Sequence, residues 1–355
     1  MKRLKCTVAY VGAAYDGWQS QKLGLSVQEQ LETAVARIND RKTKITGSGR
    51  TDAGVNAREQ VFMFDTDRDA MSCRKWMGAV NAFLPEDIHI TKIEEVSPLF
   101  HARYNVRWKK YTYRVHTGTY DVFSAKTAYQ CPIELDFEVM KKTASILEGR
   151  HDFTSFNSSP LSLYPDQVRN VFRIELEKTG DDISISFYGK GFLQYMVRMM
   201  SSAIIETGKH KITPEHVRDM LEAKKKDVPR KNAPACGLTL EHVEYFEMVA
   251  YDQETQIREY LRDDPLPASW WSLEDLEARV RENRYPRAYM YCTKTTQQPL
   301  GFFCLYEEGS KGELVLFDAD QYKEKAEHIL PELARNDLYH AGISICAFDE
   351  KSLRF

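Results

Sequence analysis

The sequence predicts a mixed α+β protein that folds into two or three domains. Its 355 residues, 43% of them hydrophobic, are enough to bury more than one core. Stretches with strand-like alternation, such as residues 4–11, are interspersed with stretches whose apolar residues recur at helical spacing, such as 26–38. A change in charge near residue 250 separates a slightly basic first part from an acidic last part.

In the first 90 residues the sequence pattern predicts alternating strands and helices, which supports the mixed α+β class. Residues 4–11 are β-prone and run into a turn at 12–19, after which Ser26 opens a helix with a capping-box pattern. Residues 60–64 (QVFMF) form a nearly continuous apolar run, which is typical of a central strand. The remaining elements expected here are a helix over 73–84 and a strand over 87–90.

The glycine-rich stretch GSGRTDAGVNA at residues 47–57 is the strongest candidate for a functional site. Its three glycines permit tight turns that bring backbone close to a bulky ligand, and they present one carboxylate, Asp52. Taken alone, such a loop is more often a turn whose carboxylate accepts local hydrogen bonds or pairs with Arg50. It does not match a phosphate-binding loop, because Asp52 replaces the last glycine of G-x-G-x-x-G and no Gly-Lys-Ser/Thr follows.

A second informative stretch, RWKKYTYRV at residues 107–115, predicts a strand. Side chains alternate between the faces of a strand, so Lys109, Tyr111 and Tyr113 share one side. That aromatic and cationic face is equally consistent with two structures. One is a hairpin surface with amphipathic tyrosines, and the other is a platform on which a nucleobase stacks while a cation holds phosphates.

Beyond residue 115 the pattern of helices and strands continues. His151 and Asp152 are adjacent in GRHDFTSF, but neighbours on a turn rarely face one another, so no catalytic dyad is expected. The expected elements are a helix over 139–147, a loop over 157–167, a strand from Val168, a strand over 183–187, a helix over 191–207 and a helix from Thr213.

Seven motifs, in order, resemble those of the tRNA pseudouridine synthase A (TruA) family. The loop at 47–57 resembles the family signature G-x-G-R-T-D-A-G-V-H-A, and the resemblance covers residues 5–247. It implies two similar α/β halves with antiparallel sheets around a central cleft, here roughly 1–105 and 106–247. The other motifs are YDGWQSQ with SVQEQLE (15–32), FHAR with K-x-Y-x-Y (100–113), GRHDFTSF (149–156), R-x-V (169–171), MVR (196–198) and APACGLTL (233–240).

The resemblance implies that the protein isomerises uridine to pseudouridine in the anticodon stem-loop of tRNA, at positions 38–40 in the family, without cofactor or metal. Asp52 is then the catalytic nucleophile and Tyr111 the active-site tyrosine. Arg169 is the ion-pair partner that keeps the Asp52 carboxylate ionised and oriented. Contacts to RNA or within the site are expected from Arg50, Lys109, Lys110 and Arg198.

One position departs from the family signature. Asn56 stands where the family usually has histidine. An asparagine still forms hydrogen bonds, so we expect the fold to survive, but the contact that the imidazole makes with the backbone or the RNA is in question.

Composition excludes several other classes. The seven cysteines are far apart with no C-x-x-C pair, and the nine histidines are scattered, so neither a disulfide scaffold nor a metal site is expected. No apolar run approaches the roughly 20 residues that span a bilayer. The basic start is not followed by an apolar signal-peptide core, so a cytoplasmic location without membrane contact is expected.

The last third, residues 252–355, is predicted to be a separate acidic α/β domain. Residues 249–355 carry 13 basic and 20 acidic residues, a net charge of −7, whereas the first 248 have a net charge of +4. Such acidity disfavours contact with an RNA backbone. The expected elements are a helix over 273–283, strands over 288–293, 299–306 and 313–317, a helix over 323–335 and a strand over 342–347.

This last third faintly resembles GNAT-type N-acetyltransferases through PLGFFCLY (299–306) and FDEKSLRF (348–355), but it lacks the Arg/Gln-x-x-Gly-x-Gly/Ala loop that binds pyrophosphate in that family. A non-catalytic module that docks on the synthase domain or on a partner protein is therefore favoured over a second enzyme.

Two alternative functions remain open at this level. The first is a non-catalytic RNA-binding or tRNA-folding protein, against which the joint presence of Asp52, Tyr111 and Arg169 argues. The second is acetyltransferase activity of the C-terminal module. Dimers occur in the TruA family, so a homodimer that binds one tRNA across both subunits is also compatible with the sequence.

Overall fold

The computed structural model describes residues 2–21, 24–96, 100–103, 106–228, 231–251, 287–293, 299–305, 311–316 and 342–347. Its contacts group the chain into two units. The first comprises residues 1–95 and 108–243, and the second comprises 96–107 and 244–355. No helix among the described residues has the length and apolar character needed to cross a bilayer.

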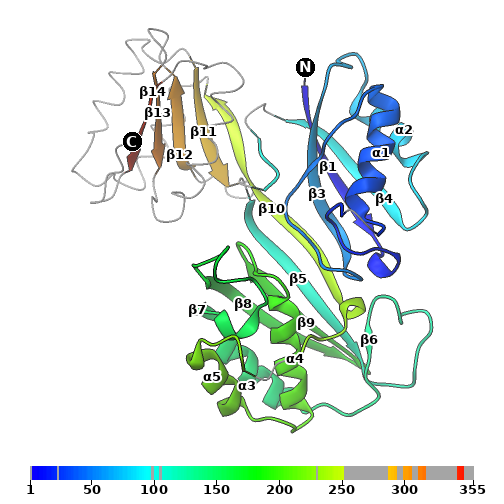
Figure 1. Ribbon diagram of the computed structural model, residues 1–355, viewed down its shortest axis with the longest axis vertical. Helices are drawn as coiled ribbons and strands as arrows, with labels where there is room; N and C mark the ends of the chain where they lie inside the picture. The colour runs from blue at the N-terminus through cyan, green and yellow to red at the C-terminus, as the bar shows by residue number, and fades with distance from the viewer. Residues whose placement is uncertain are drawn as a thin grey trace. The chain divides into compact units, whose positions relative to one another are not determined.

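The first half of unit 1 is a small sheet with two helices against it (Figure 1). Strand β1 lies between β3 and β4, and its antiparallel register with β3 pairs Leu4 with Phe64. The elements are β1 (Lys2–Tyr10), α1 (Val27–Asn39), β2 (Thr46–Gly47), β3 (Asn56–Thr66), α2 (Cys73–Asn81) and β4 (Ile88–Val96).

Local sequence explains these elements. Leu4, Cys6 and Val8 alternate along β1 and are fully buried, as the strand pattern predicts. Residues 60–64 of β3 are all buried, which confirms the expected central strand. Helix α1 begins where predicted, because the Ser26 hydroxyl accepts a hydrogen bond from the Glu29 amide (3.2 Å).

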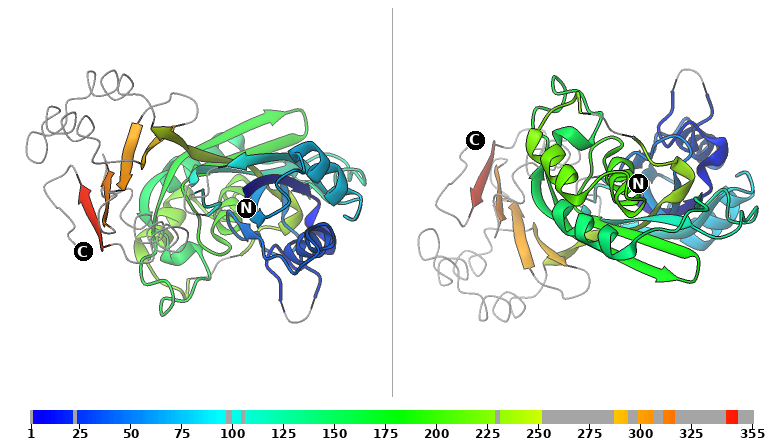
Figure 2. Two further views of the ribbon diagram at one scale, coloured as in Figure 1. Left: turned by 90° about the horizontal axis from the view of Figure 1, so that it is seen from above. Right: turned by 90° about the horizontal axis from the view of Figure 1, so that it is seen from below.

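The second half of unit 1 repeats this plan at larger size. Strand β5 lies between β10 and β9, with β8 and β7 beyond, and the helices lie against the strands of their own half (Figures 1 and 2). The elements are β5 (Val106–His116), β6 (Tyr129–Gln130), α3 (Phe137–Leu147), β7 (Gly149–Asp152), β8 (Val168–Thr179), β9 (Asp182–Gly189), α4 (Met196–Gly208), α5 (Pro214–Ala223) and β10 (Leu238–Tyr251).

The two halves meet edge to edge through a short parallel pairing of β3 with β10, in which Asn56 pairs with Thr239 and Ala57 with Leu240. In each half the first strand is central, since β1 lies between β3 and β4, and β5 lies between β9 and β10. The predicted α+β class with two similar halves is therefore confirmed.

One helix differs from its prediction. Helix α4 begins at Met196, not near Gly191, because Tyr195 adopts a left-handed conformation (φ 61°). The residues before it bend back toward the loop at 157–167, where the Ser158 amide donates to the Gln194 carbonyl (3.0 Å). This bend places the first turn of α4 beside the glycine-rich loop and was not visible in the apolar spacing.

In unit 2, the end of β10 pairs with β11 (Arg287–Thr293), which continues to β12 (Pro299–Leu305), β13 (Lys311–Leu316) and β14 (Gly342–Ala347). The pairs are antiparallel except β13 with β14, which is parallel. All four strands expected in the last third are thus present. The helices expected over 273–283 and 323–335 lie outside the described residues.

Candidate active site

The glycine-rich loop connects β2 to β3 and packs against the turn that precedes α1. The Trp18 backbone amide donates a hydrogen bond to the Thr51 carbonyl (3.1 Å). Gly17 adopts a φ of +100°, and a side chain there would come within 2.8 Å of the same carbonyl oxygen. The turn around Gly17 therefore serves to hold the backbone next to Asp52.

Two buried polar side chains hold the loop from the sheet side. Gln60 on β3 accepts a hydrogen bond from the Ser48 hydroxyl (2.6 Å) and donates to the Gly49 carbonyl (3.0 Å). The Tyr10 hydroxyl lies 2.8 Å from the Thr51 hydroxyl. Hydrogen bonds away from water hold their groups firmly, since breaking one leaves a buried polar atom unpaired. The sequence reading missed both residues, although Gln60 is the one polar residue in its apolar run.

Asn56 fastens the end of the loop to three other segments. Its carboxamide oxygen accepts from the Gly12 amide (2.8 Å), and its nitrogen donates to the carbonyls of Cys236 (2.9 Å) and Lys126 (3.1 Å). The side chain is 3% exposed. The predicted survival of the fold with asparagine at this position is therefore explained by a full set of buried hydrogen bonds.

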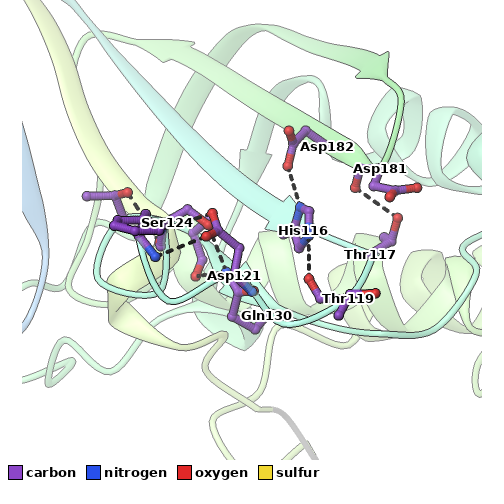
Figure 3. Close-up of polar contacts among 11 residues, drawn as sticks. His116, Thr117, Thr119, Asp121, Ser124, Gln130, Asp181 and Asp182 are labelled. Carbon is purple, nitrogen blue, oxygen red and sulfur yellow. Dashed lines mark hydrogen bonds and ion pairs between the residues drawn. The ribbon is translucent and has the colours of Figure 1, made fainter.

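The Lys126 carbonyl comes from the loop between β5 and β6, whose internal hydrogen bonds are drawn in Figure 3. The Asp121 carboxylate accepts from the Ser124 amide (3.1 Å), and the Gln130 side chain accepts from the Asp121 amide (2.9 Å). Hydrogen bonds from Ser124 and a neighbouring amide lower the pKa of Asp121. This loop therefore presents a fixed acceptor to Asn56.

Asp52 is mostly buried, with 19% of its side chain exposed, and its carboxylate faces Arg198 on α4 at 3.8 Å. Burial raises the pKa of Asp52 from 3.8 to about 6, and the positive charge of Arg198 opposes that rise. At neutral pH about nine-tenths of this carboxyl group is ionised. A partly desolvated carboxylate beside one cation suits a nucleophile.

The structure brings Arg198, and not Arg169, to the Asp52 carboxylate. Arg198 is fixed in place, because its Nε donates to the Ala233 carbonyl (2.8 Å), the Ala233 amide donates to the Arg198 carbonyl (3.2 Å), and its guanidinium lies 5.3 Å from the centre of the Tyr195 ring. The segment before β10 thus orients the arginine that faces Asp52.

The expected ion pair between Arg169 and Asp52 is therefore corrected. Arg169 lies on β8, two strands away from β5, and donates to the carbonyls of Val168 (2.6 Å) and Asp166 (3.3 Å) in its own segment. Two arginines with equivalent chemistry cannot be ranked from sequence spacing, since only packing decides which reaches the loop.

Tyr111 lies in the same site. It is 8% exposed, and its ring contacts the edge of Phe192 (centroids 5.4 Å apart, planes at 87°). Burial, followed by the nearby Tyr10 and Asp52 charges, raises its pKa, so the phenol stays neutral. Tyr113, on the same face of β5, donates its hydroxyl to the Pro234 carbonyl (2.9 Å) and is structural. Phe192 was missed because it sits in an apolar stripe.

The predicted cationic residues separate into three environments. Lys109 shares the Tyr111 face of β5, as alternation predicts, but is 8% exposed and donates to the Ser48 carbonyl (2.8 Å). Lys110, on the opposite face, lies over the Tyr188 ring at 5.4 Å. Arg50 is exposed, and the described part of the chain offers it no hydrogen bond or ion pair.

His151 and Asp152 lie on strand β7 and not on the expected turn, and they bond to different partners. The His151 ring lies 2.8 Å from the Glu148 carbonyl, and Asp152 accepts from the amide and hydroxyl of Thr154 (2.9 and 2.6 Å). Among the residues that the structure describes, no cluster of three or more acidic, histidine or cysteine side chains is arranged to hold a metal.

Comparison with known proteins agrees with this geometry. The family model described as tRNA pseudouridine synthase matches residues 7–105 and 143–246. Three relatives share the name tRNA pseudouridine synthase A. The protein of Brevibacillus brevis is 40% identical over 69% of this chain and 100% of its own length, that of Oceanobacillus iheyensis 41% over 70% and 98%, and that of Bacillus subtilis 38% over 68% and 99%.

The relatives therefore match the chain over nearly their whole lengths, and the family-model match ends at residue 246, close to the start of the acidic last third. The family model matches parts of both halves of unit 1, including the loop that carries Asp52 and helix α4 with Arg198, whereas strand β5 with Lys109 and Tyr111 lies between its two matched stretches. The chain belongs to the tRNA pseudouridine synthase family.

Proposed function

We propose that the chain isomerises uridine to pseudouridine in tRNA, with Asp52 as the nucleophile. The observation that carries the proposal is the largely buried Asp52 carboxylate, whose pKa is raised to about 6. It faces Arg198, and its charge adds to the effect of burial in raising the pKa of Tyr111. The relatives' name supports tRNA as the substrate class. The family resemblance further supports uridines of the anticodon arm, at positions 38–40.

The reaction breaks the bond from N1 of the base to C1′ of the ribose and forms a bond from C5 to C1′. C5 loses its proton and N1 gains one, so the product is an isomer and no redox partner is required. Asp52 supplies the electron pair, by attack at C6 of the base or at C1′ of the ribose. Arg198 orients the carboxylate, and the neutral Tyr111 contacts the base and offers a hydroxyl proton.

A base within a stem must leave the stack before Asp52 reaches it, which costs a few kcal/mol. Arg50, exposed and two residues before Asp52, is placed to contact RNA while the base is flipped. Lys110 on the outer face of β5 is a candidate for phosphate contact, and we no longer assign that role to the buried Lys109.

The test uses a tRNA transcript tritiated at C5 of its uridines. Wild-type protein releases tritium, because the new bond forms at C5, and Asp52→Asn releases none. Asp219→Asn is the matched control, since Asp219 is an exposed carboxylate on α5. A wild-type protein that binds several tRNAs without releasing tritium from any of them contradicts the proposal and supports the RNA-binding alternative.

For residues 252–355 we propose a protein-interaction role in the cytoplasm, with the synthase domain or a partner as the surface it contacts. The net charge of −7 over 249–355 supports this role, because it opposes contact with phosphates. Truncation after Tyr245 should leave tRNA affinity at low salt unchanged. A loss of affinity contradicts the role, and calorimetric binding of acetyl-CoA would support acetyltransferase activity instead. Size measurement of both proteins tests whether the chain forms a homodimer.

A further inference from the structure

Two cations from the second half of unit 1 hold the glycine-rich loop of the first half. Arg198 faces Asp52, as described above. Lys109, from the middle of β5, donates its ammonium to the Ser48 carbonyl at 2.8 Å. The loop is therefore attached to the second half at both ends of a five-residue span, and Tyr111 lies two residues beyond Lys109 on the same face.

The absence of a side chain at Gly49 leaves room for the Lys109 ammonium. A Cβ added at Gly49 would lie 2.5 Å from Nζ of Lys109 and 3.9 Å from its Cε. Gly49 is not among the glycines with positive φ, so its backbone conformation does not require glycine. Glycine is required here because a side chain would collide with the lysine. The ammonium packs directly against the α-carbon of this glycine.

The other polar groups of this part of the loop are engaged from the first half. The Ser48 amide donates to the Val61 carbonyl (2.7 Å), its hydroxyl donates to Gln60, and Gln60 donates to the Gly49 carbonyl. The Ser48 carbonyl accepts its hydrogen bond from the Lys109 ammonium of the second half. Loss of the lysine donor would leave a buried carbonyl unpaired at the start of the catalytic loop.

We propose that Lys109 is a positioning residue for Asp52 and not a phosphate ligand. Its hydrogen bond to Ser48 fixes the position of the glycine-rich loop relative to Tyr111 and Arg198. A lysine that is 8% exposed and whose ammonium already donates to a backbone carbonyl is poorly placed for RNA phosphates. Lys109 therefore affects the chemical step and not the affinity for tRNA. These kinetic consequences rest on the proposed function.

The first experiment compares Lys109→Met with Lys178→Met, an exposed lysine on β8, by tritium release and by tRNA binding over a range of salt concentrations. For Lys109→Met we expect kcat to fall by about 10-fold or more, with KM within about twofold and the salt dependence of binding unchanged. If Lys109 binds a phosphate, KM rises and the slope of log K against log salt falls by about 0.7–0.9, which overturns the proposal.

A double-mutant cycle tests the contact itself. Gly49→Ala should lower kcat alone, because its Cβ displaces the ammonium from Ser48. In the Lys109→Met background the terminal methyl occupies about the place of the lysine Cε, 3.9 Å away, so Gly49→Ala should then cost less than about twofold. An equal loss in both backgrounds means that Gly49 acts independently of Lys109 and overturns the proposal.

Amide hydrogen exchange separates this proposal from the proposed function. Exchange in the peptide covering 46–55 should be faster in Lys109→Met than in wild type and Lys178→Met, at temperatures where circular dichroism shows all three proteins folded. Hydrogen exchange tests the positioning role of Lys109 even if the wild-type protein releases no tritium. Unchanged protection of this peptide in a folded Lys109→Met protein contradicts the positioning role.

Discussion

Replacement of Arg198 by methionine should move the pH dependence of the reaction to higher pH. The Arg198 guanidinium lies 3.8 Å from the Asp52 carboxylate and partly offsets the effect of burial, so that the pKa of Asp52 is about 6 with the arginine in place. Removing this positive charge destabilises the carboxylate relative to the protonated acid, so the pKa of Asp52 must rise further.

The size of the shift follows from the geometry. Two unit charges 3.8 Å apart interact by about 4 kcal/mol at an effective dielectric constant of about 20, which corresponds to about three pKa units. Both side chains keep some exposure (14% and 19%), and water that enters the vacated space screens the remaining charge, so we expect about one to two units. At pH 7 the ionised fraction of Asp52 would fall from about 90% to between about 50% and 10%.

The assay is single-turnover tritium release from pH 5 to 9. The acidic limb of the wild-type profile is expected near pH 6, and that of Arg198→Met near pH 7–8, in addition to a lower plateau from the lost orientation of the carboxylate. Arg169→Met is the informative comparison, because Arg169 bonds to its own strand and its loss should leave the acidic limb in place. An unshifted limb in Arg198→Met, or a shifted one in Arg169→Met, refutes the assignment.

Three further outcomes are expected. Asn56→Ala should lower the free energy of unfolding by about 2–3 kcal/mol in urea denaturation, because three hydrogen bonds are lost within a buried site, whereas the exposed Asn170→Ala should change it little. Asp52→Asn should stabilise the protein by about 3 kcal/mol at pH 7.5 and by much less near pH 4. The folded-state pKa of about 6 lies above the ordinary value of 3.8, so ionisation of this carboxyl group destabilises the fold as the pH rises from about 4 to 6. If Asp52→Asn raises the melting temperature by the same amount at both pH values, the raised pKa is contradicted. Phe192→Ala should lower kcat about 3- to 10-fold with an unchanged acidic limb, because Tyr111 loses its edge contact, and unaltered turnover would show that this contact does not position the tyrosine.

Many of the helices and strands could be predicted from the sequence because they depend on local patterns. The alternation in β1, the apolar run in β3 and the Ser26 cap of α1 each specify an element through interactions between near neighbours. The strands observed at 287–293, 299–305, 311–316 and 342–347 were likewise expected from short β-prone runs, with bounds that differ by at most two residues. The start of α4 was not, because Tyr195 turns the chain through a left-handed conformation that serves packing against a distant loop.

The amino-acid sequence by itself determined the α+β class, the glycine-rich loop with Asp52 at its centre, and the strand that places Lys109 and Tyr111 on one face. Only the tertiary structure decided that Arg198 and not Arg169 meets Asp52, that Lys109 is buried against the loop, and that Asn56 joins three segments. The physical reason is that these contacts join residues far apart in the chain, and their energies depend on distance and burial, which spacing along the sequence does not record.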